Sequence, residues 1–473
     1  MLKGFLYVAI SKYSNIILGL IISAVLARLL TPEEFGTLAL VTVFIGFFSL
    51  LGDMGVGPAI VQQKDLTGKD LSSIFGFTII MGFILGVIFF LSAPYISDFY
   101  NEPALIPLVK LLSLVIFFNV IRIVPSALNR KKLRFKEMAV VSVSIRVVTG
   151  TIAIIMAVKG FSYYSLVTQS ILNGIFGFGI FFYLYPVKFT FFIKSGPLKK
   201  IASFSGFQFA FNFINYFSRN LDTIFIGKFL GSAPLGYYNK SYSLMMLPVS
   251  NLTHVISPVL HPVLAKHQDD KEYIFKTYLR LLKLLALIGF PISVFLYHAS
   301  PELIFIMFGE QWGESIPVFQ ILAFTVGLQI CLSSTGGIFQ AINRTDLLFI
   351  SGLLSAVLMV SAICFGVFIG ESLESVGYGL LMAFFINFFQ GFYMLFVLGL
   401  KQNLKPFFRI LLLPLLGALF LGIILYAYSF FQIESRVLSL IIKTIIFGLV
   451  MLLLITSSKS TKEMVLLILK RKK

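Results

Sequence analysis

A-R-L-L-T-P-E-E-F-G at residues 27–36 is matched without a gap, 200 residues later, by G-K-F-L-G-S-A-P-L-G at residues 227–236. Each copy reads as an apolar helix, a short turn and a second apolar helix that leads to a proline and a polar loop. The alternative is chance matching among Leu- and Phe-rich helices, and the agreement of the turns argues against it. We therefore predict an internal repeat. The same offset pairs Asn15 with Asn215, Arg28 with Lys228, Leu30 with Leu230, Gly36 with Gly236 and Pro58 with Pro258.

The composition places this repeat in a membrane. Of the 473 residues, 58% are hydrophobic and 12% are charged, whereas soluble domains carry about 25% charged residues. Mean hydropathy is +0.95, and apolar runs of about 20 residues recur along the chain, which indicates an all-α polytopic membrane protein. The run at residues 2–30 shows no cleavage site after a short apolar core, so we expect a retained helix rather than a signal peptide. Two related halves in such a protein are typical of transporters.

Apolar runs between polar breaks predict about 14 transmembrane helices, arranged as two pseudo-symmetric six-helix lobes plus two C-terminal helices. The helices are expected near residues 10–30, 36–61, 71–95, 104–128, 137–158, 161–185, 201–229, 236–263, 277–299, 315–341, 346–369, 374–399, 407–430 and 437–456. The predicted organisation is an N-terminal lobe at residues 1–185, a cytoplasmic linker at 186–200, a C-terminal lobe at 201–399, helices 13 and 14 at 400–456 and a basic cytoplasmic tail at 457–473.

The net charge of +18 is divided unevenly between the two sets of loops. If the N-terminus is inside, the cytoplasmic loops are basic and the opposite loops acidic, which is the positive-inside pattern and predicts that both termini are cytoplasmic. The basic residues are dispersed over these loops, so they do not indicate nucleic-acid binding. The basic set is Lys64, Lys69, Arg130, Lys131, Lys132, Arg134, Lys136, Lys188, Lys194, Lys199, Lys200, Lys266, Lys271, Lys276, Arg344, Lys401, Lys405, Arg409 and the tail cations; the acidic set is Glu33, Glu34, Asp98, Glu102, Glu302, Glu310, Glu314, Glu371, Glu374 and Glu434.

The predicted seventh helix carries a stripe of polar side chains. Its members are spaced three and four residues apart, so they share one face of an otherwise apolar helix. Such a stripe is typical of a helix that lines a water-filled cavity. The alternative is that Arg219 and Asp222 form a structural ion pair between helices. The stripe consists of Ser205, Gln208, Asn212, Asn215, Arg219 and Asp222.

Charged residues within the predicted spans are candidates for function because burying a charge in a bilayer is costly. Asp53 lies in G-D-M-G-V-G-P at residues 52–58, a glycine-rich helix break whose freed backbone groups are suited to binding an ion or a substrate. The embedded cations outnumber Asp53 and Asp222, so we expect a cationic cavity and an anionic substrate, with Arg suited to bidentate phosphate contacts. Snorkelling of Arg28, Arg122 and Lys228 to the interface is the alternative. The cations are Arg28, Arg122, Arg146, Arg219 and Lys228.

Motifs of enzymes are missing from the sequence. No phosphate-binding G-x-x-x-x-G-K-[ST] loop is present, so the chain is not expected to hydrolyse ATP. The four histidines show no metal-ligand spacing. The sequence predicts neither a catalytic site, nor a metal site, nor a cofactor, and transport would be driven by a proton or sodium gradient.

Five segments together resemble polysaccharide exporters of the Wzx type, in the multidrug/oligosaccharidyl-lipid/polysaccharide exporter superfamily. The resemblance covers helices 1 to 12 and weakens over helices 13 and 14. It implies two six-helix lobes plus two further helices, and flipping of undecaprenyl-diphosphate-linked oligosaccharide units across the bacterial inner membrane for cell-surface polysaccharide synthesis. The motifs do not separate colanic-acid-type from teichuronic-acid-type exporters. They are A-R-L-L-T-P-E-E-F-G at 27–36, G-D-M-G-V-G-P-A-I-V-Q at 52–62, R-N-L-D-T-I-F-I-G-K-F-L-G at 219–231, L-G-Y-Y-N-K-S-Y at 235–242 and F-G-E-Q-W-G-E-S-I-P at 308–317.

On this interpretation the lipid diphosphate binds Arg146 and Arg219 near the midplane, with Arg28 and Lys228 toward the outer side. Asp53 and Asp222 are the candidates for ion coupling. The expected partners are the lipid-linked oligosaccharide, membrane lipids, and a polysaccharide polymerase and chain-length regulator.

Three other functions were weighed. A drug or cation antiporter of the same superfamily should have a more acidic cavity. A membrane polymerase or glycosyltransferase should show a large outer loop or an acidic catalytic motif. A non-transporting scaffold would leave the polar stripe without a purpose.

Overall fold

The computed structural model describes residues 2–190, 196, 213, 216–217, 220–265, 267–431 and 433–457, without the side chains of residues 2–6 and 254–263. All regular structure in this part of the chain is helical. Eleven of these helices are long and apolar enough to cross a membrane, or twelve if a pair bent by 45° at residues 315–341 is one span. The predicted all-α membrane fold is confirmed, whereas the count of 14 helices is not.

The chain divides into two compact units, Met1–Gly236 and Tyr237–Lys473. This boundary lies 36 residues after the end of the predicted linker at 186–200. Most of that linker lies outside the described residues, so the predicted limits of the lobes stay predictions. The first unit contains α1 (Leu2–Leu29), α2 (Pro32–Asp53), α3 (Val56–Gln62), α4 (Gly68–Leu91), α5 (Ala93–Tyr100), α6 (Leu105–Ile121), α7 (Ile123–Lys131), α8 (Phe135–Val158), α9 (Tyr164–Leu184) and the π-helix η1 (Ile226–Leu230).

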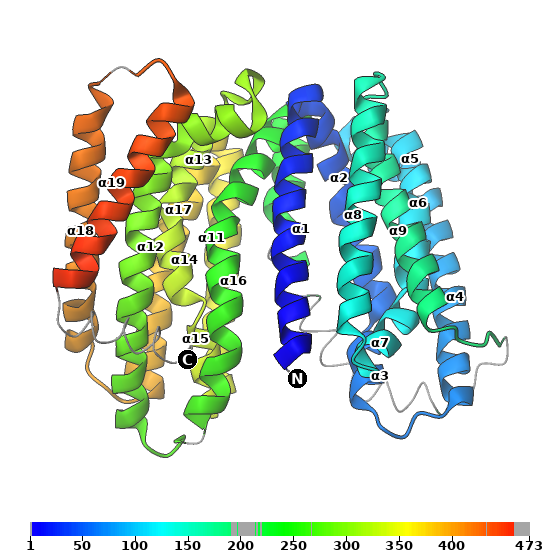
Figure 1. Ribbon diagram of the computed structural model, residues 1–473, viewed down its shortest axis with the longest axis horizontal. Coiled ribbons are helices and arrows are strands. Elements are labelled where there is room, and N and C mark those ends of the chain that lie inside the picture. The colour runs from blue at the N-terminus through cyan, green and yellow to red at the C-terminus, as the bar shows by residue number, and fades with distance from the viewer. Residues whose placement is uncertain are drawn as a thin grey trace. The chain divides into compact units, whose positions relative to one another are not determined.

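Local sequence signals set several of the helix starts. Thr31 accepts a hydrogen bond from the Glu34 N–H while the Glu34 carboxylate accepts one from the Thr31 N–H, a capping box that starts α2. Thr67 and Asp70 start α4 in the same way. Within the first unit, α1 packs on α8, α8 on α9, α9 on α6 and α6 on α4, as Figure 1 shows for the run from α8 to α4. These contacts join the helices of the first unit into one bundle.

The two copies of the repeat meet at the first turns of α2 and α11 (Ser232–Ala265). The two helices start at Pro32 and Ser232, 200 residues apart. A Cβ atom on Gly36 would overlap the carbonyl of Ser232, and a Cβ atom on Gly236 would overlap the carbonyl of Pro32. The two contacts are related by the same 200-residue offset. The repeat therefore has a symmetric contact in the structure.

The second unit is built around a long helix, α12, which packs on α13, α14, α18 and α19. Its elements after α11 are α12 (Lys271–Phe308), the 3-10 helix η2 (Glu310–Trp312), α13 (Ser315–Ala323), α14 (Thr325–Leu332), α15 (Thr335–Ala341), α16 (Thr345–Phe368), α17 (Leu373–Tyr393), the π-helix η3 (Met394–Gly399), α18 (Lys405–Ser429) and α19 (Arg436–Ser457).

The prediction for α12 was too short, and it placed Glu302 in an outer loop. The helix runs from Lys271 to Phe308, and Glu302 is buried within it. Pro301 and Glu302 look like the end of a span in the sequence. The carboxylate is tolerated inside because the Lys443 ammonium of α19 lies 2.5 Å from it.

Two of the quoted motifs pack against each other in the second unit. Lys240, in the segment at 235–242, places its ammonium 5.0 Å from the ring centre of Phe308 and 5.5 Å from that of Trp312. The Ser241 hydroxyl donates to the Ser315 carbonyl at 2.8 Å. Trp312 is fully buried. These two motifs therefore join the start of α11 to the turn after α12, which is a packing role.

Candidate functional site

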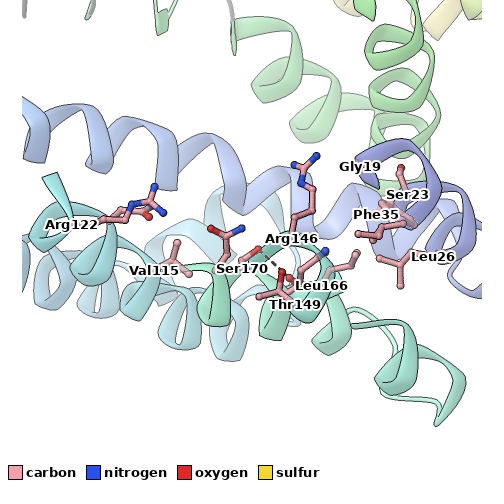
Figure 2. Close-up of a pocket in the computed structure, with 14 residues that line it drawn as sticks. Gly19, Ser23, Leu26, Phe35, Val115, Arg122, Arg146, Thr149, Leu166 and Ser170 are labelled. Atoms are coloured by element: carbon pink, nitrogen blue, oxygen red, sulfur yellow. Dashed lines mark hydrogen bonds between the residues drawn. The ribbon is translucent and has the colours of Figure 1, made fainter. Parts of the chain in front are cut away.

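The first unit contains an open polar pocket of about 490 Å³. Side chains from α1, α2, α6, α8 and α9 line it, together with Arg122 after α6. In Figure 2, Arg122 lies at one end, Leu26 and Phe35 at the other, and Arg146 between them. The uncharged polar lining comprises Ser23, Asn119, Thr149, Gln169, Ser170 and Asn173.

Arg146 is positioned by α1. It projects from α8, and its Nη1 donates a hydrogen bond to the Asn15 carbonyl. A Cβ atom on Gly19 would overlap the same guanidinium, so the absence of a side chain there makes room for it. The Asn15 amide also donates to the Ser142 hydroxyl at 3.1 Å, which fixes α1 against α8. Among the described residues, one of the five guanidinium donors of Arg146 is used in this way.

Arg122 lies at the break between α6 and α7, where it is the C-cap residue of α6. Its side chain runs over Gly177 of α9, where a Cβ atom would stand 3.0 Å from the Arg122 Cδ and closer still to Nη1. Gly177 is buried. A helix glycine thus makes room for each of the two arginines of the pocket.

The electrostatic character of the pocket is cationic. Among the described residues, its lining contains Arg122 and Arg146 but no Asp or Glu. Among the residues that the structure describes, neither arginine forms an ion pair; the four ion pairs present involve other cations. Both arginines are half-buried. Two cations held inside a membrane unit without a counter-charge favour an anionic ligand.

The neutral wall of the pocket comes mainly from α9. Gln169, Ser170 and Asn173 face the pocket from this helix, and Asn119 does so from α6. Amide side chains donate and accept hydrogen bonds, as sugar hydroxyls require. The sequence analysis missed these residues. The spacing of Gln169 and Asn173, four residues apart in an apolar helix, was the signal that could have found them.

Thr149 adds an unused hydroxyl to this wall. Its Oγ1 is buried and has no hydrogen-bond partner among the residues that the structure describes. A ligand oxygen is the kind of group that would satisfy it.

The other predicted cations either lie outside this pocket or fall outside the described residues. Arg28 is exposed in the last turn of α1 and does not line the pocket. Lys228 lies in η1, with its ammonium 5.3 Å from the ring centre of Phe99 on α5. Three predicted site residues fall outside the described residues: Asn212, Asn215 and Arg219.

The two candidate coupling carboxylates both accept backbone hydrogen bonds. Asp53 Oδ1 accepts from the Gly57 N–H at 3.4 Å, across the break between α2 and α3. It therefore satisfies one of the backbone donors that the break was expected to free. Asp222 is buried, and its Oδ1 accepts from the Thr223 N–H at 2.7 Å. Neither lines the pocket.

Comparison with known proteins gives relatives over nearly the whole chain. Teichuronic acid biosynthesis protein TuaB of Bacillus subtilis (strain 168) is 27% identical over 434 residues, covering 90% of this chain and 89% of that protein. Lipopolysaccharide biosynthesis protein WzxC of Escherichia coli (strain K12) is 28% identical over 430 residues, covering 87% of this chain and 84% of that protein.

The fold also matches a solved structure, lipid II flippase MurJ in an inward closed conformation. The TM-score is 0.76 at 16% sequence identity, with 97% of this chain and 99% of that chain covered. This likeness shows a shared fold.

A protein-family model also matches the sequence. The family is described as "Polysaccharide biosynthesis protein", and the match covers residues 25–317, more than half of the chain. The chain therefore belongs to the polysaccharide biosynthesis protein family, as a polytopic membrane transport protein and not an enzyme.

Proposed function

We propose that this protein flips undecaprenyl-diphosphate-linked oligosaccharide repeat units from the inner to the outer leaflet of the bacterial inner membrane, for cell-surface polysaccharide synthesis. Alternating access is the proposed mechanism. Support comes from the names of TuaB and WzxC, which concern teichuronic acid and lipopolysaccharide biosynthesis. Further support comes from the fold shared with a lipid II flippase.

The observation that carries the proposal is the cationic pocket of the first unit. Arg122 and Arg146 are half-buried there, and no carboxylate of the described residues pairs with them. A diphosphate supplies the missing negative charge. Its oxygens suit the planar guanidinium fork, which binds phosphate in a bidentate manner.

The neutral wall is suited to the sugar that follows the diphosphate. Asn119, Gln169 and Asn173 present amides to the same pocket that holds the arginines. We propose that these amides bind hydroxyls of the first sugar, while the remaining sugars extend beyond the pocket.

An antiporter for cationic drugs is the alternative within the same fold. Such a protein needs acidic side chains where its substrate binds, because a cation is stabilised by carboxylates and repelled by guanidinium groups. The pocket described above has two arginines and no carboxylate in its lining. Its charge therefore favours the anionic lipid.

Coupling to a proton or sodium gradient is part of the proposal. Asp222 is the stronger candidate, because it follows Arg219 by three residues in the sequence, whereas Asp53 has no such neighbour. A polymerase and a chain-length regulator remain proposed partners.

The proposal is tested by measuring binding of a fluorescent undecaprenyl-diphosphate disaccharide to the purified full-length protein. Arg122→Gln combined with Arg146→Gln should weaken binding by about 100-fold or more, because each charge-assisted hydrogen bond contributes roughly 1.5–3 kcal/mol. The charge-matched control is Lys132→Gln with Lys136→Gln, two exposed lysines outside the pocket. It should bind as the wild type does.

A second ligand isolates the role of the phosphates. The same lipid and sugar joined without phosphate should bind weakly, and equally to the wild type and to the double arginine variant. Equal affinity of the wild type and the arginine variant for the diphosphate ligand would contradict the assigned pocket.

A further inference from the structure

The second unit carries an apolar groove of about 580 Å³, at the end of α17 and the start of α18. Its walls are largely aromatic. The rings of Phe389 and Phe408 stack across it with centres 6.2 Å apart. Phe385 and Phe408 are 49% and 51% exposed. Because α17 and α18 both qualify as membrane spans, rings that are half-exposed on these helices are accessible to the hydrocarbon of a bilayer.

The groove has a direction relative to the membrane. On α17 its lining runs from Phe385 to Tyr393, eight residues that rise by about 12 Å. On α18 it runs from Leu404 to Phe408, at the very start of the helix. One end therefore opens at the loop between the two helices, and the other reaches into the span. A lipid with its headgroup at the loop would extend its acyl chain in the same direction as this groove.

The loop end of the groove is strongly basic. Three exposed cations lie close in sequence to the lining residues of α18: Lys401, Lys405 and Arg409. No acidic residue occurs between residues 375 and 433. Arg344 also reaches this end, where it donates to the Leu398 carbonyl at 3.3 Å, but its charge is paired with Asp346. Three cations without an acidic neighbour in sequence thus flank an apolar groove.

We propose that this groove is a binding site for an anionic phospholipid of the inner leaflet. One acyl chain lies along the rings of Phe385, Phe389 and Phe408, and the phosphate lies among Lys401, Lys405 and Arg409. The positive-inside distribution predicts that this loop is cytoplasmic, which places the cations at the headgroups of the inner leaflet. Basic clusters at the cytoplasmic ends of membrane helices attract anionic lipid. The site is separate from the pocket of the first unit and does not depend on the proposed substrate.

Native mass spectrometry of the delipidated full-length protein tests the site. The probes are dioleoyl phosphatidylglycerol and dioleoyl phosphatidylethanolamine, which have the same chains and differ in net charge. The wild type should retain the anionic lipid preferentially. Lys401→Gln, Lys405→Gln and Arg409→Gln together should lower that retention by about tenfold or more. Phe389→Ala with Phe408→Ala should lower it while all three cations remain.

The matched control removes three exposed cations of other loops that are predicted to be cytoplasmic, as Lys64→Gln, Lys69→Gln and Lys132→Gln. Its retention of phosphatidylglycerol should equal that of the wild type. Equal loss in the control and in the groove variant would overturn the site, and so would equal retention of the two lipids by the wild type. Displacement of phosphatidylglycerol by an equimolar amount of undecaprenyl diphosphate would overturn the choice of occupant.

Discussion

Gly19 on α1 and Gly177 on α9 leave the space in which the guanidinium groups of Arg146 and Arg122 lie. Any side chain at either position would push the neighbouring arginine out of its place. The positions of the two arginines therefore depend on the absence of a side chain at these glycines of the facing helices. This dependence can be tested without changing a charge.

Gly177→Ala should displace Arg122, because the new Cβ would overlap its guanidinium. We expect affinity for the lipid diphosphate to fall by about tenfold or more, the loss of one charge-assisted contact. Gly179→Ala is the control on the same helix, since its Cβ would meet no atom within 4 Å. Both changes raise helix propensity equally. Indistinguishable binding by the two variants would show that Arg122 does not contact the ligand.

At this scale the sequence singled out the two arginines of the pocket and none of its uncharged polar side chains. The embedded arginines were identifiable because a charged side chain within a membrane span is costly, so its presence indicates a functional role. Asn119 was not, because an isolated amide in an apolar helix does not indicate which neighbour it faces. That information is in the packing of α6, α8 and α9, which one sequence does not contain.

The contact between α12 and α19 shows how the last hairpin is attached to the second unit. In the interior of the second unit the Lys443 ammonium lies 2.5 Å from Glu302 Oε1 and 2.6 Å from the His298 carbonyl. At the helix ends Arg436 pairs with Glu310, and this contact holds the pKa of the Glu310 carboxyl below its ordinary value. The first ion pair joins α19 to α12 and the second joins it to η2, directly after α12, and the two pairs differ in burial.

This difference predicts unequal costs. Glu302→Gln should destabilise the second unit by about 3–5 kcal/mol, because it leaves Lys443 buried without a counter-charge. Glu310→Gln removes an exposed pair and should cost about 1 kcal/mol or less. Thermal melting in detergent measures both. Combining Glu302→Leu with Lys443→Met should recover much of the lost stability. Equal melting temperatures for the two single variants would contradict a structural role for the buried pair.

For the elements, the sequence predicted the apolar spans well and their breaks poorly. Long apolar runs require helices in lipid, since every backbone donor must be satisfied within the segment. Glu302 was placed in a loop because its partner lies 141 residues away on α19. Long-range pairing of this kind cannot be read from the local pattern.

For the whole molecule, the 200-residue offset is the feature that connects sequence and structure. α2 and α11 start at Pro32 and Ser232, and the glycines one turn later each lie against the other helix. The offset was visible in the sequence, but the mutual contact of the two copies was not. Small residues at such crossings allow backbones to approach closely in membranes.

A symmetric contact predicts symmetric effects. Gly36→Ala and Gly236→Ala should each lower stability by roughly 1–3 kcal/mol, because each Cβ would overlap a backbone carbonyl that cannot rotate away. Gly352→Ala on α16 is the control, with open space around its Cβ. Melting temperatures of the purified variants provide the measurement. A large loss at one position and none at the other would contradict the equivalence of the two copies.

Transport itself is tested most directly by flipping in proteoliposomes. A fluorescent undecaprenyl-diphosphate oligosaccharide is placed in both leaflets, and its appearance on the outer surface is followed with and without an imposed proton or sodium gradient. We predict that the wild type flips the lipid, that a gradient accelerates flipping, and that Arg122→Gln with Arg146→Gln abolishes it. Flipping by the arginine variant at the wild-type rate, or no flipping by the wild type under any gradient, would contradict the proposed function.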